Sequence, residues 1–277
     1  MKSHPQDRTE TLQQQANRIR QQVIRLVARR GQGYVQQGLG AADIFTAIYL
    51  NEMNIHAGYF SDIGRDRCIL STAHNSAVFH ATLAEAGLLD SNRLDTYCDD
   101  GSELEVNVSE RLGDSVEATC GSLGQGLSVA VGMALSAKKK ALHGRYFVIL
   151  GDGEMQEGQT WEAAMSAASF GLDNICLVVD MNRMQVEGDT DQVIKMEPVA
   201  DKWRAFGWEV CEVDGNNMEG LLRSFSRARN NTEKPFAVIA HTVAGKGVPF
   251  LEGQLSHNMV LDATTANDAL KVLEEAS

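Results

Sequence analysis

The amino-acid sequence predicts an α/β protein, a doubly wound and mostly parallel sheet flanked by helices. The first observation is that short apolar runs rich in β-forming residues, such as Tyr146–Leu150 and Ile175–Val179, alternate with segments of helical composition. The second is that glycine and polar residues follow these runs directly, as in Gly151-Asp152-Gly153. This alternation of strand and helix signals is typical of βαβ units with parallel strands.

The N-terminal part predicts two helices before the first strand of the sheet. Thr11–Arg30 carries apolar residues at three-to-four spacing, which predicts an amphipathic helix. The glycine- and glutamine-rich segment Gly31–Gly40 is expected to be a loop that leads into a helix over Ala41–Leu50. Arg67–Ser71 then predicts a strand, and Ser76–Ala86 predicts the helix after it.

The rest of the chain continues the same alternation. Glu103–Thr119 lacks a clean period and is expected to be a loop, whereas Gly121–Gly126 opens a small-residue helix that runs to about Lys140. Glu157–Phe170 has helical spacing and joins the two apolar runs named above. Two more strands are predicted over Glu209–Val213 and Phe236–Thr242, with a helix over Met218–Asn230 between them.

Length and composition indicate one large domain. The chain has 277 residues, of which 43% are hydrophobic and 22% charged, as in soluble globular proteins. No internal repeat or linker divides it. We therefore expect a flexible N-terminus over residues 1–10, one domain over residues 11–262 and a C-terminal tail over residues 263–277.

Charge, apolar run length and cysteine usage narrow the partners and the compartment. The net charge of −12 argues against a nucleic-acid surface, although an acidic protein can still bind phosphates through backbone amides and a metal ion. No apolar stretch approaches the roughly 20 residues of a membrane span, and the N-terminus lacks the apolar core of a signal peptide. The five cysteines show no spacing typical of zinc or of a disulfide framework. We expect a cytoplasmic protein with no membrane or nucleic-acid partner.

The candidate site is the Gly151-Asp152-Gly153 turn together with Asn182. Each follows a predicted strand, and the carboxyl ends of parallel strands in a βαβ unit meet at one sheet edge. Asp152 and Asn182 would then supply two oxygen ligands beside glycines that let the backbone approach a phosphate, which suggests Mg²⁺ or Ca²⁺ carrying a diphosphate. Alone, such a turn is more often only a tight connection. Asn182 and the nearby acidic Glu154 and Glu157 favour the metal site.

Several ordered segments carry a resemblance to one family. They are Leu39–Ile44, Leu70–His74, Val116–Gly126, Gly151–Gly158 and Gly245–Gly247. Their order, and the pairing of the Gly-Asp-Gly turn with an upstream glycine loop, resemble the N-terminal part of transketolase from about residue 15 to about residue 260. A full transketolase is more than twice as long. The chain therefore resembles the N-terminal, diphosphate-binding subunit of a split bacterial transketolase.

The resemblance implies the thiamine diphosphate-binding fold called the PP domain, in which a divalent cation, Mg²⁺ or Ca²⁺, holds the cofactor. Asp152 and Asn182 would ligate the cation through side-chain oxygens, and Met184 would ligate it through its backbone carbonyl. Gly153 and Glu154 would offer backbone amides to the diphosphate. Asn182 also counts among the expected cofactor contacts.

The same resemblance implies contacts with the rest of the cofactor. His74 and His257 would lie near the diphosphate and the reacting centre, as cofactor contacts and catalytic residues. Without the family match, His74 could simply cap the next helix and His257 could be an ordinary solvated histidine. Gly121 and Leu123 would lie along the aminopyrimidine and the bent thiazolium.

Two positions depart from the family pattern. Tyr34 follows Gly33, and Asn107 follows Val106, where the family usually has Gly-His at both places. Those histidines normally hydrogen-bond the sugar donor and acceptor near the reacting carbons. Tyr34 and Asn107 can still donate hydrogen bonds and stay candidate catalytic residues, but neither carries an imidazole. The cofactor half of the site thus matches the family, whereas the substrate half differs from it.

The implied activity is transfer of a two-carbon ketol unit from a ketose, or ketose phosphate, to an aldose acceptor, with the cofactor as electron sink. In this family a glutamate that activates the aminopyrimidine comes from a separate pyrimidine-binding domain. We therefore expect the chain to be inactive without a C-terminal partner subunit that carries this domain, in an α₂β₂ assembly that includes self-association. Glu157 and Glu162 match family positions at the subunit contact.

Two other functions stay open at this point. One is another thiamine diphosphate enzyme, such as a 2-oxoacid dehydrogenase α subunit or a relative of deoxyxylulose-phosphate synthase. Glu157-Gly158 and the Gly121–Gly126 loop weigh against it, and decarboxylation of a 2-oxoacid would support it. The other is a cofactor-binding or regulatory subunit without turnover, which Tyr34 and Asn107 keep open.

Overall fold

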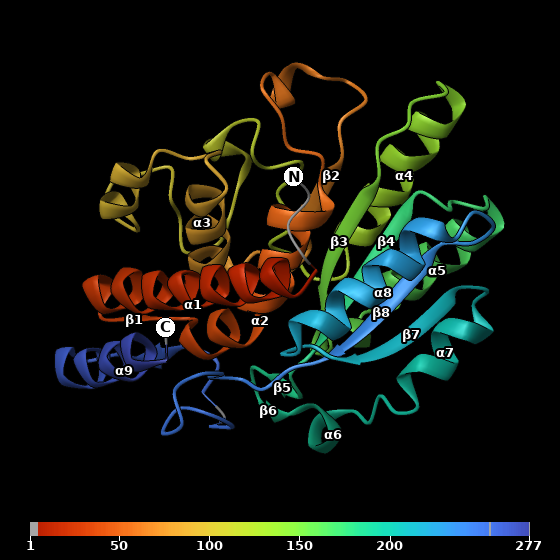
Figure 1. The fold of residues 1–277 in the computed structure, drawn as a ribbon. Helices are drawn as coiled ribbons and strands as arrows, with labels where there is room; N and C mark the ends of the chain where they lie inside the picture. Colours follow the sequence, from red (N-terminus) through yellow and green to blue (C-terminus); the bar gives the residue numbers. More distant parts are fainter. Residues whose placement is uncertain (1–4, 255, 277) are drawn as a thin grey trace.

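The computed structural model, which describes residues 5–254 and 256–276, has a central sheet with helices on both faces (Figure 1). The sheet contains five parallel strands in the order β2-β3-β4-β8-β7. Their bounds are β2 (Arg67–Leu70), β3 (Tyr146–Gly151), β4 (Ile175–Met181), β8 (Phe236–His241) and β7 (Glu209–Asp214). The predicted doubly wound, parallel α/β fold is confirmed.

The helices divide between the two faces of the sheet. One side holds α1 (Pro5–Arg30), α2 (Val35–Ala47), α3 (Ser76–Glu85) and α8 (Met218–Asn230). The other side holds α4 (Gly126–Lys139), α5 (Gly158–Ser169) and α7 (Val199–Ala205). Strand β3 shows the reason, because Phe147 and Ile149 join the first core while Val148 and Leu150 join the second. Successive side chains of a strand point to opposite faces, so a run that is apolar throughout needs helices on both.

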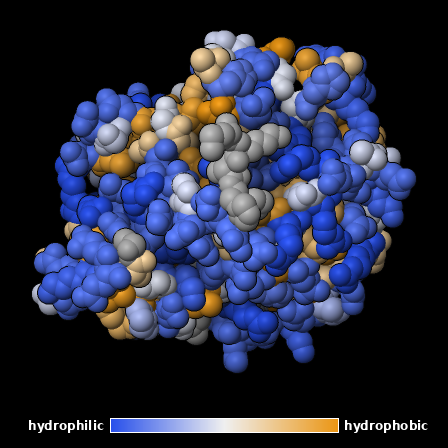
Figure 2. All heavy atoms as spheres, viewed as in Figure 1, coloured by the Kyte–Doolittle hydropathy of each residue, from blue (hydrophilic) through white to orange (hydrophobic). Residues whose placement is uncertain are grey.

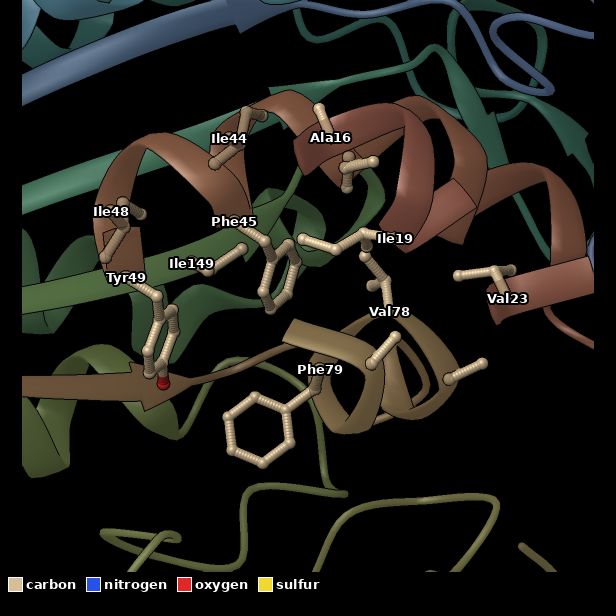
Figure 3. Close-up of a cluster of buried hydrophobic side chains, with 14 of the residues drawn as sticks. Ala16, Ile19, Val23, Ile44, Phe45, Ile48, Tyr49, Val78, Phe79 and Ile149 are labelled. Carbon is tan, nitrogen blue, oxygen red and sulfur yellow. The ribbon is translucent and has the colours of Figure 1, made fainter. Parts of the chain in front are cut away.

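The core on the α1 side is densely packed around Phe45 of α2. Figure 3 shows its ring between side chains of α1, α2, α3 and the sheet, including Ile19, Val78 and Ile149. All four of these side chains are essentially inaccessible to solvent. This packing anchors the N-terminal helices onto β3, the strand that carries the Gly-Asp-Gly turn.

Shorter elements surround the carboxyl ends of the strands. A two-stranded pair joins β1 (Gln32–Gly33) to β9 (Met259–Val260), and a small hairpin joins β5 (Met184–Gln185) to β6 (Gly188–Asp189). The remaining short helices are Ile48–Glu52, Tyr59–Ser61, Ser91–Thr96, Glu110–Leu112, Gly153–Gln156 and α6 (Thr190–Val193). The β1–β9 pair and the β5–β6 hairpin, not foreseen from periodicity, bring distant segments to this sheet edge.

The glycine-rich segment Gly31–Gly40 differs from the expectation. It was expected to be a loop, but helix α2 begins at Val35, so Gly38 and Gly40 are helical. The glycines serve close packing rather than flexibility, since a Cβ on Gly40 would lie 2.9 Å from the carbonyl oxygen of Val243. A glycine in a helix interior costs about 1 kcal/mol, which close backbone approach offsets here.

The two ends of the described chain are also helical. Helix α1 begins at Pro5, so residues 5–10 of the segment expected to be flexible belong to a helix; residues 1–4 lie outside the described part. The segment expected to be a C-terminal tail forms α9 (Ala263–Glu275), with residue 277 outside the described part. Ala266, Ala269 and Leu273 of α9 are buried in the core that includes α1. Apolar spacing over 13 residues thus makes α9 part of the fold.

The face of the molecule seen in Figure 2 is mainly polar. Figure 2 shows hydrophilic residues over most of one face, with hydrophobic residues in small, separate groups. Among residues 5–254 and 256–276, none of the helices combines the length and apolar character needed to cross a membrane. All five cysteines are free thiols.

Candidate active site

A cavity of about 160 Å³ lies where the parallel strands end. Register pairs Gly151 of β3 with Asp180 of β4, so the turn after β3 and the loop after β4 meet at one edge, as the βαβ argument predicts. The lining residues come from separate segments of the chain: Gln37; Thr72, His74 and Asn75; Leu123; Gly151–Glu154, Gln156 and Glu157; Asp180, Asn182 and Met184–Val186; and His257.

Two buried carboxylates form the floor of this cavity. Asp152 Oδ1 accepts a hydrogen bond from the Gly153 amide at 2.8 Å, and Oδ2 accepts one from the Arg183 amide at 2.6 Å. Asp180 accepts from the Thr242 hydroxyl and from Asn182 Nδ2, the latter at 3.1 Å. These bonds orient both carboxylates toward the turn that contains Asn182.

Local backbone geometry fixes the rest of the turn. Arg183 has a φ of 61°, a left-handed conformation that is costly for a residue other than glycine. Its amide donates to Asp152, and the next amide, that of Met184, donates to Asn182 Oδ1 at 2.9 Å. Gly153 must be glycine because a Cβ there would lie 2.8 Å from the Cβ of Gln185 in hairpin β5–β6. The strained turn therefore holds the carboxylate, the amide and the hairpin in one arrangement.

The electrostatics of the site are compatible with a bound cation. Burial, and then the neighbouring Asp180, raise the pKa of Asp152 to about 8. Burial raises the pKa of Asp180 to about 6, against the opposing hydrogen bonds from Thr242 and Asn182. Among the described residues that line the cavity, none is lysine or arginine. Buried carboxylates without a cationic partner are costly, so the oxygen-rich donor set fits a divalent cation.

The backbone amides of Gly153 and Glu154, expected to bind the diphosphate, lie in a turn that already has hydrogen bonds of its own. The Gly153 amide is already bonded to the side chain of Asp152, so a diphosphate would share or replace that bond. Glu154 was expected to contribute only its backbone amide. Its buried carboxylate also accepts hydrogen bonds from Ser71, Gly124 and Gly151. This role could not be predicted from the spacing motif, which identifies a turn but not the direction of a side chain.

Three rings from distant segments meet beside the cavity. The ring centroids of Tyr34, His74 and His257 lie 5.3, 5.2 and 5.3 Å apart in pairs. Burial and the neighbouring His257 lower the pKa of His74 to about 4, and burial also lowers the pKa of His257. Gln37 holds the backbone of His257 through a 2.9 Å bond from Nε2 to the carbonyl. At neutral pH His74 is therefore a neutral imidazole that can accept or donate a hydrogen bond.

Asn107 is placed differently from Tyr34. It is exposed, and it is not among the described residues that line the cavity. Its neighbours tie its loop to the segment around His74: the Val106 carbonyl accepts from Ser76 Oγ at 2.7 Å, and the Val108 amide donates to the Ala73 carbonyl at 3.0 Å. Asn107 therefore lies in a loop fastened beside the His74 segment, outside the cavity itself.

The glycine loop and the acidic positions at α5 lie at the rim. Leu123 lines the cavity and is 37% exposed, whereas Gly121 is exposed and is not among the lining residues. Glu157 is exposed and also lines the cavity. Glu162 lies further along α5 and is exposed. Leu123 and Glu157 are therefore exposed members of the cavity lining.

Further lining residues were not predicted from the sequence. Asp180 had a signal, since it stands at the end of an apolar run two residues before Asn182. Gln37 had none, because its segment was expected to be a loop. Gln185 lines the cavity only because the hairpin folds back over the turn.

Comparison with known proteins identifies the family. The family model described as transketolase, thiamine diphosphate binding domain, matches residues 11–273. The chain is 38% identical over 265 residues to a 6-deoxy-6-sulfo-D-fructose transketolase subunit of a Clostridium species, covering 95% of this chain and 96% of that protein. It is 34% identical to an apulose-4-phosphate transketolase subunit of Phocaeicola vulgatus, covering 96% of this chain and 95% of that protein. The chain belongs to the transketolase family and corresponds to its thiamine diphosphate-binding domain.

Solved structures agree with this assignment. A transketolase from Campylobacter jejuni superposes with a TM-score of 0.87 at 28% identity, over 96% of this chain. A Pichia stipitis transketolase superposes with a TM-score of 0.89 at 26% identity, over 95% of this chain. The chain spans 43% of the Campylobacter protein and 40% of the Pichia protein. It thus has the length of the subunit-type relatives and less than half the length of these transketolases.

Proposed function

We propose that the chain is the cofactor-holding subunit of a split transketolase, which moves a two-carbon ketol unit from a ketose or ketose phosphate to an aldose. The observation that carries the proposal is the buried pair Asp152 and Asp180 with Asn182, at a cavity whose described lining contains no lysine or arginine. Relatives of nearly the same length that are named transketolase subunits support it.

In this proposal each residue of the expected metal site has a role. Asp152 and Asn182 would bind Mg²⁺, or Ca²⁺, through side-chain oxygens, and Met184 through its carbonyl. The amides of Gly153 and Glu154 would bind the diphosphate at the start of the short helix Gly153–Gln156. When bound, thiamine diphosphate supplies the carbon nucleophile and the electron sink of the reaction. The chain contributes the binding and the orientation.

The ring cluster would serve the reacting end. With their lowered pKa values, His74 and His257 are neutral imidazoles that can accept a proton from, or return it to, a substrate hydroxyl. The Tyr34 hydroxyl would donate a hydrogen bond where the family has a histidine. Asn107 would meet the substrate further out, because it is exposed and lies outside the cavity. The substrate is a sugar or sugar phosphate.

The partner in this proposal is a C-terminal subunit with the pyrimidine-binding domain, in an α₂β₂ assembly. Gly121 and Leu123, both exposed, would contact the aminopyrimidine and thiazolium. On α5, which carries Glu162, the exposed apolar side chain of Met165 is 54% accessible and suits a subunit contact. We propose the cytoplasm as the compartment, because all five cysteines are free thiols.

A reconstitution experiment tests the function. The full chain, with thiamine diphosphate and Mg²⁺, is assayed for ketol transfer alone and with its pyrimidine-domain partner, and Asp152→Asn serves as the inactive control. Activity only in the reconstituted complex is expected. Robust transfer by the chain alone would overturn the split-enzyme proposal. Decarboxylation of a 2-oxoacid, or cofactor binding without any transfer by the complex, would instead support one of the two alternatives.

A further inference from the structure

The Glu154 side chain connects three segments that are far apart in the sequence. It is 2% exposed. Its Oε1 accepts from the Gly124 amide at 2.8 Å and from the Ser71 hydroxyl, and its Oε2 accepts from the Gly151 amide at 3.2 Å. The same Ser71 hydroxyl accepts from the amide of Gly126 at 3.2 Å. One carboxylate therefore joins the end of β2, the Gly-Asp-Gly turn and the loop Gly121–Gly126.

The segments meet with no spare room. A Cβ on Gly126 would lie 2.4 Å from Ser71 Oγ, and a Cβ on Gly124 would lie 2.7 Å from the Cβ of Glu157. Gly124 also has a φ of 85°, where other residues are strained. These contacts restrict how the loop can pack against its neighbours. The hydrogen bonds from Ser71 and Gly124 to Glu154 then fix the position of the loop relative to the turn.

We propose that Glu154 is a positioning residue, whose carboxylate sets the spacing between the loop Gly121–Gly126 and the metal site of the Gly-Asp-Gly turn. The expected effect on cofactor binding rests on the proposed function, in which the loop touches the aminopyrimidine and thiazolium through Gly121 and Leu123. The turn holds the diphosphate end of the same cofactor. A fixed spacing between the two ends lets one molecule satisfy both without ordering the loop at the moment of binding.

The chemistry of the carboxylate predicts how variants differ. Glu154→Ala removes all three acceptor bonds. Glu154→Gln keeps the size and places an amide oxygen where Oε1 accepts from Ser71 and Gly124, but its NH₂ group would face the Gly151 amide, donor against donor. The alanine variant should therefore release the loop and loosen the turn, whereas the glutamine variant should loosen the turn by the same lost bond and keep the loop. Glu219→Gln on α8, an exposed position paired with Arg223, is the matched control.

Two probes separate positioning from folding. Inorganic diphosphate with Mg²⁺ tests the turn alone, and thiamine diphosphate with Mg²⁺ tests the turn and the loop together, each on the full chain with its partner subunit. For Glu154→Ala we expect the Kd of thiamine diphosphate to rise at least about tenfold and that of inorganic diphosphate to change by less than about threefold. Glu154→Gln should stay within about threefold for thiamine diphosphate. Equal weakening of both probes by Glu154→Ala, or of neither, would overturn the inference.

A cofactor-free measurement keeps the inference separate from the proposed function. In the full chain without ligands, amide hydrogen exchange at Gly124 should be at least about tenfold faster in Glu154→Ala than in the wild type or in Glu219→Gln. Unchanged exchange at Gly124 in a folded Glu154→Ala chain would refute the role of the carboxylate. If the wild-type complex binds no thiamine diphosphate, the proposed function fails, and the exchange experiment still decides whether Glu154 positions the loop.

Discussion

Cation binding by this chain should depend on pH because the buried carboxyl group of Asp152 must lose a proton before it can bind a cation. The pKa of Asp152 lies near 8 through burial and the charge of Asp180, so at pH 7 most cation-free molecules hold a proton on Asp152. A divalent cation needs the carboxylate form, and binding must release that proton. The perturbation that tests this is Asp180→Asn, which removes the neighbouring charge and keeps the shape of the side chain.

The magnitude follows from the pKa. Below pH 8, each pH unit costs about 1.4 kcal/mol to ionise Asp152, so cation affinity should fall about tenfold per unit between pH 8 and pH 6. In Asp180→Asn the pKa of Asp152 should be lower, because its second cause is gone while burial, the larger cause, stays. The variant should therefore show a shallower fall in affinity over the same range.

The assay is titration calorimetry of Mg²⁺ with inorganic diphosphate, in pairs of buffers with different ionisation heats that count the protons released. Both proteins meet the same ligand titration, so the protons released by diphosphate itself cancel in their difference. Asp180, with a pKa of about 6, is mostly ionised at a pH of about 6.5, so most of the remaining difference comes from Asp152. We expect close to one proton released per cation by the wild type at a pH of about 6.5 and fewer by a folded Asp180→Asn chain. Equal proton counts in the two proteins, with flat affinity from pH 8 to pH 6, would refute the reasoning.

Three further predictions concern stability and activity. The folded pKa of Asp152 lies above its ordinary value of 3.8, so the folded chain holds the extra proton and the stability of the cation-free protein should fall as pH rises from about 4 to about 8; melting curves of Asp152→Asn should lack that fall. Gly126→Ala should lower the free energy of unfolding in urea by about 1–3 kcal/mol through its clash with Ser71, whereas Gly132→Ala on the same helix, which meets nothing within 4 Å, should raise it by up to about 1 kcal/mol. Tyr34→His should raise kcat/KM of the reconstituted complex for common ketose phosphates by about tenfold, and an unchanged or lower value would show that Tyr34 is not what separates this site from the family pattern.

Much of the fold could be predicted because its signals are local. The apolar runs of β3 and β4 are short, continuous and followed by polar turns, and the structure places both within about two residues of the expected bounds. Asp152 and Asn182 could be paired because they follow neighbouring parallel strands, whose ends meet at one edge. The loop expectation for Gly31–Gly40 was wrong for the opposite reason. Two of its glycines are required by close packing of α2 against other parts of the chain: Gly40 lies against Val243 and Gly38 lies against Val23 of α1. A sequence pattern does not reveal such contacts.

The sequence by itself determined the order of strands and helices, the family, and the turn that is expected to bind a cation, because each depends on residues close together in the chain. Only the tertiary structure decided that Tyr34, His74 and His257 form one ring cluster, since their segments meet through the pairing of β1 with β9 and the end of β2. It also decided which groups the Glu154 carboxylate contacts, in three separate segments. The sequence pattern reflects the residues that are close along the chain. Side-chain directions and contacts between distant segments depend on how the whole core packs.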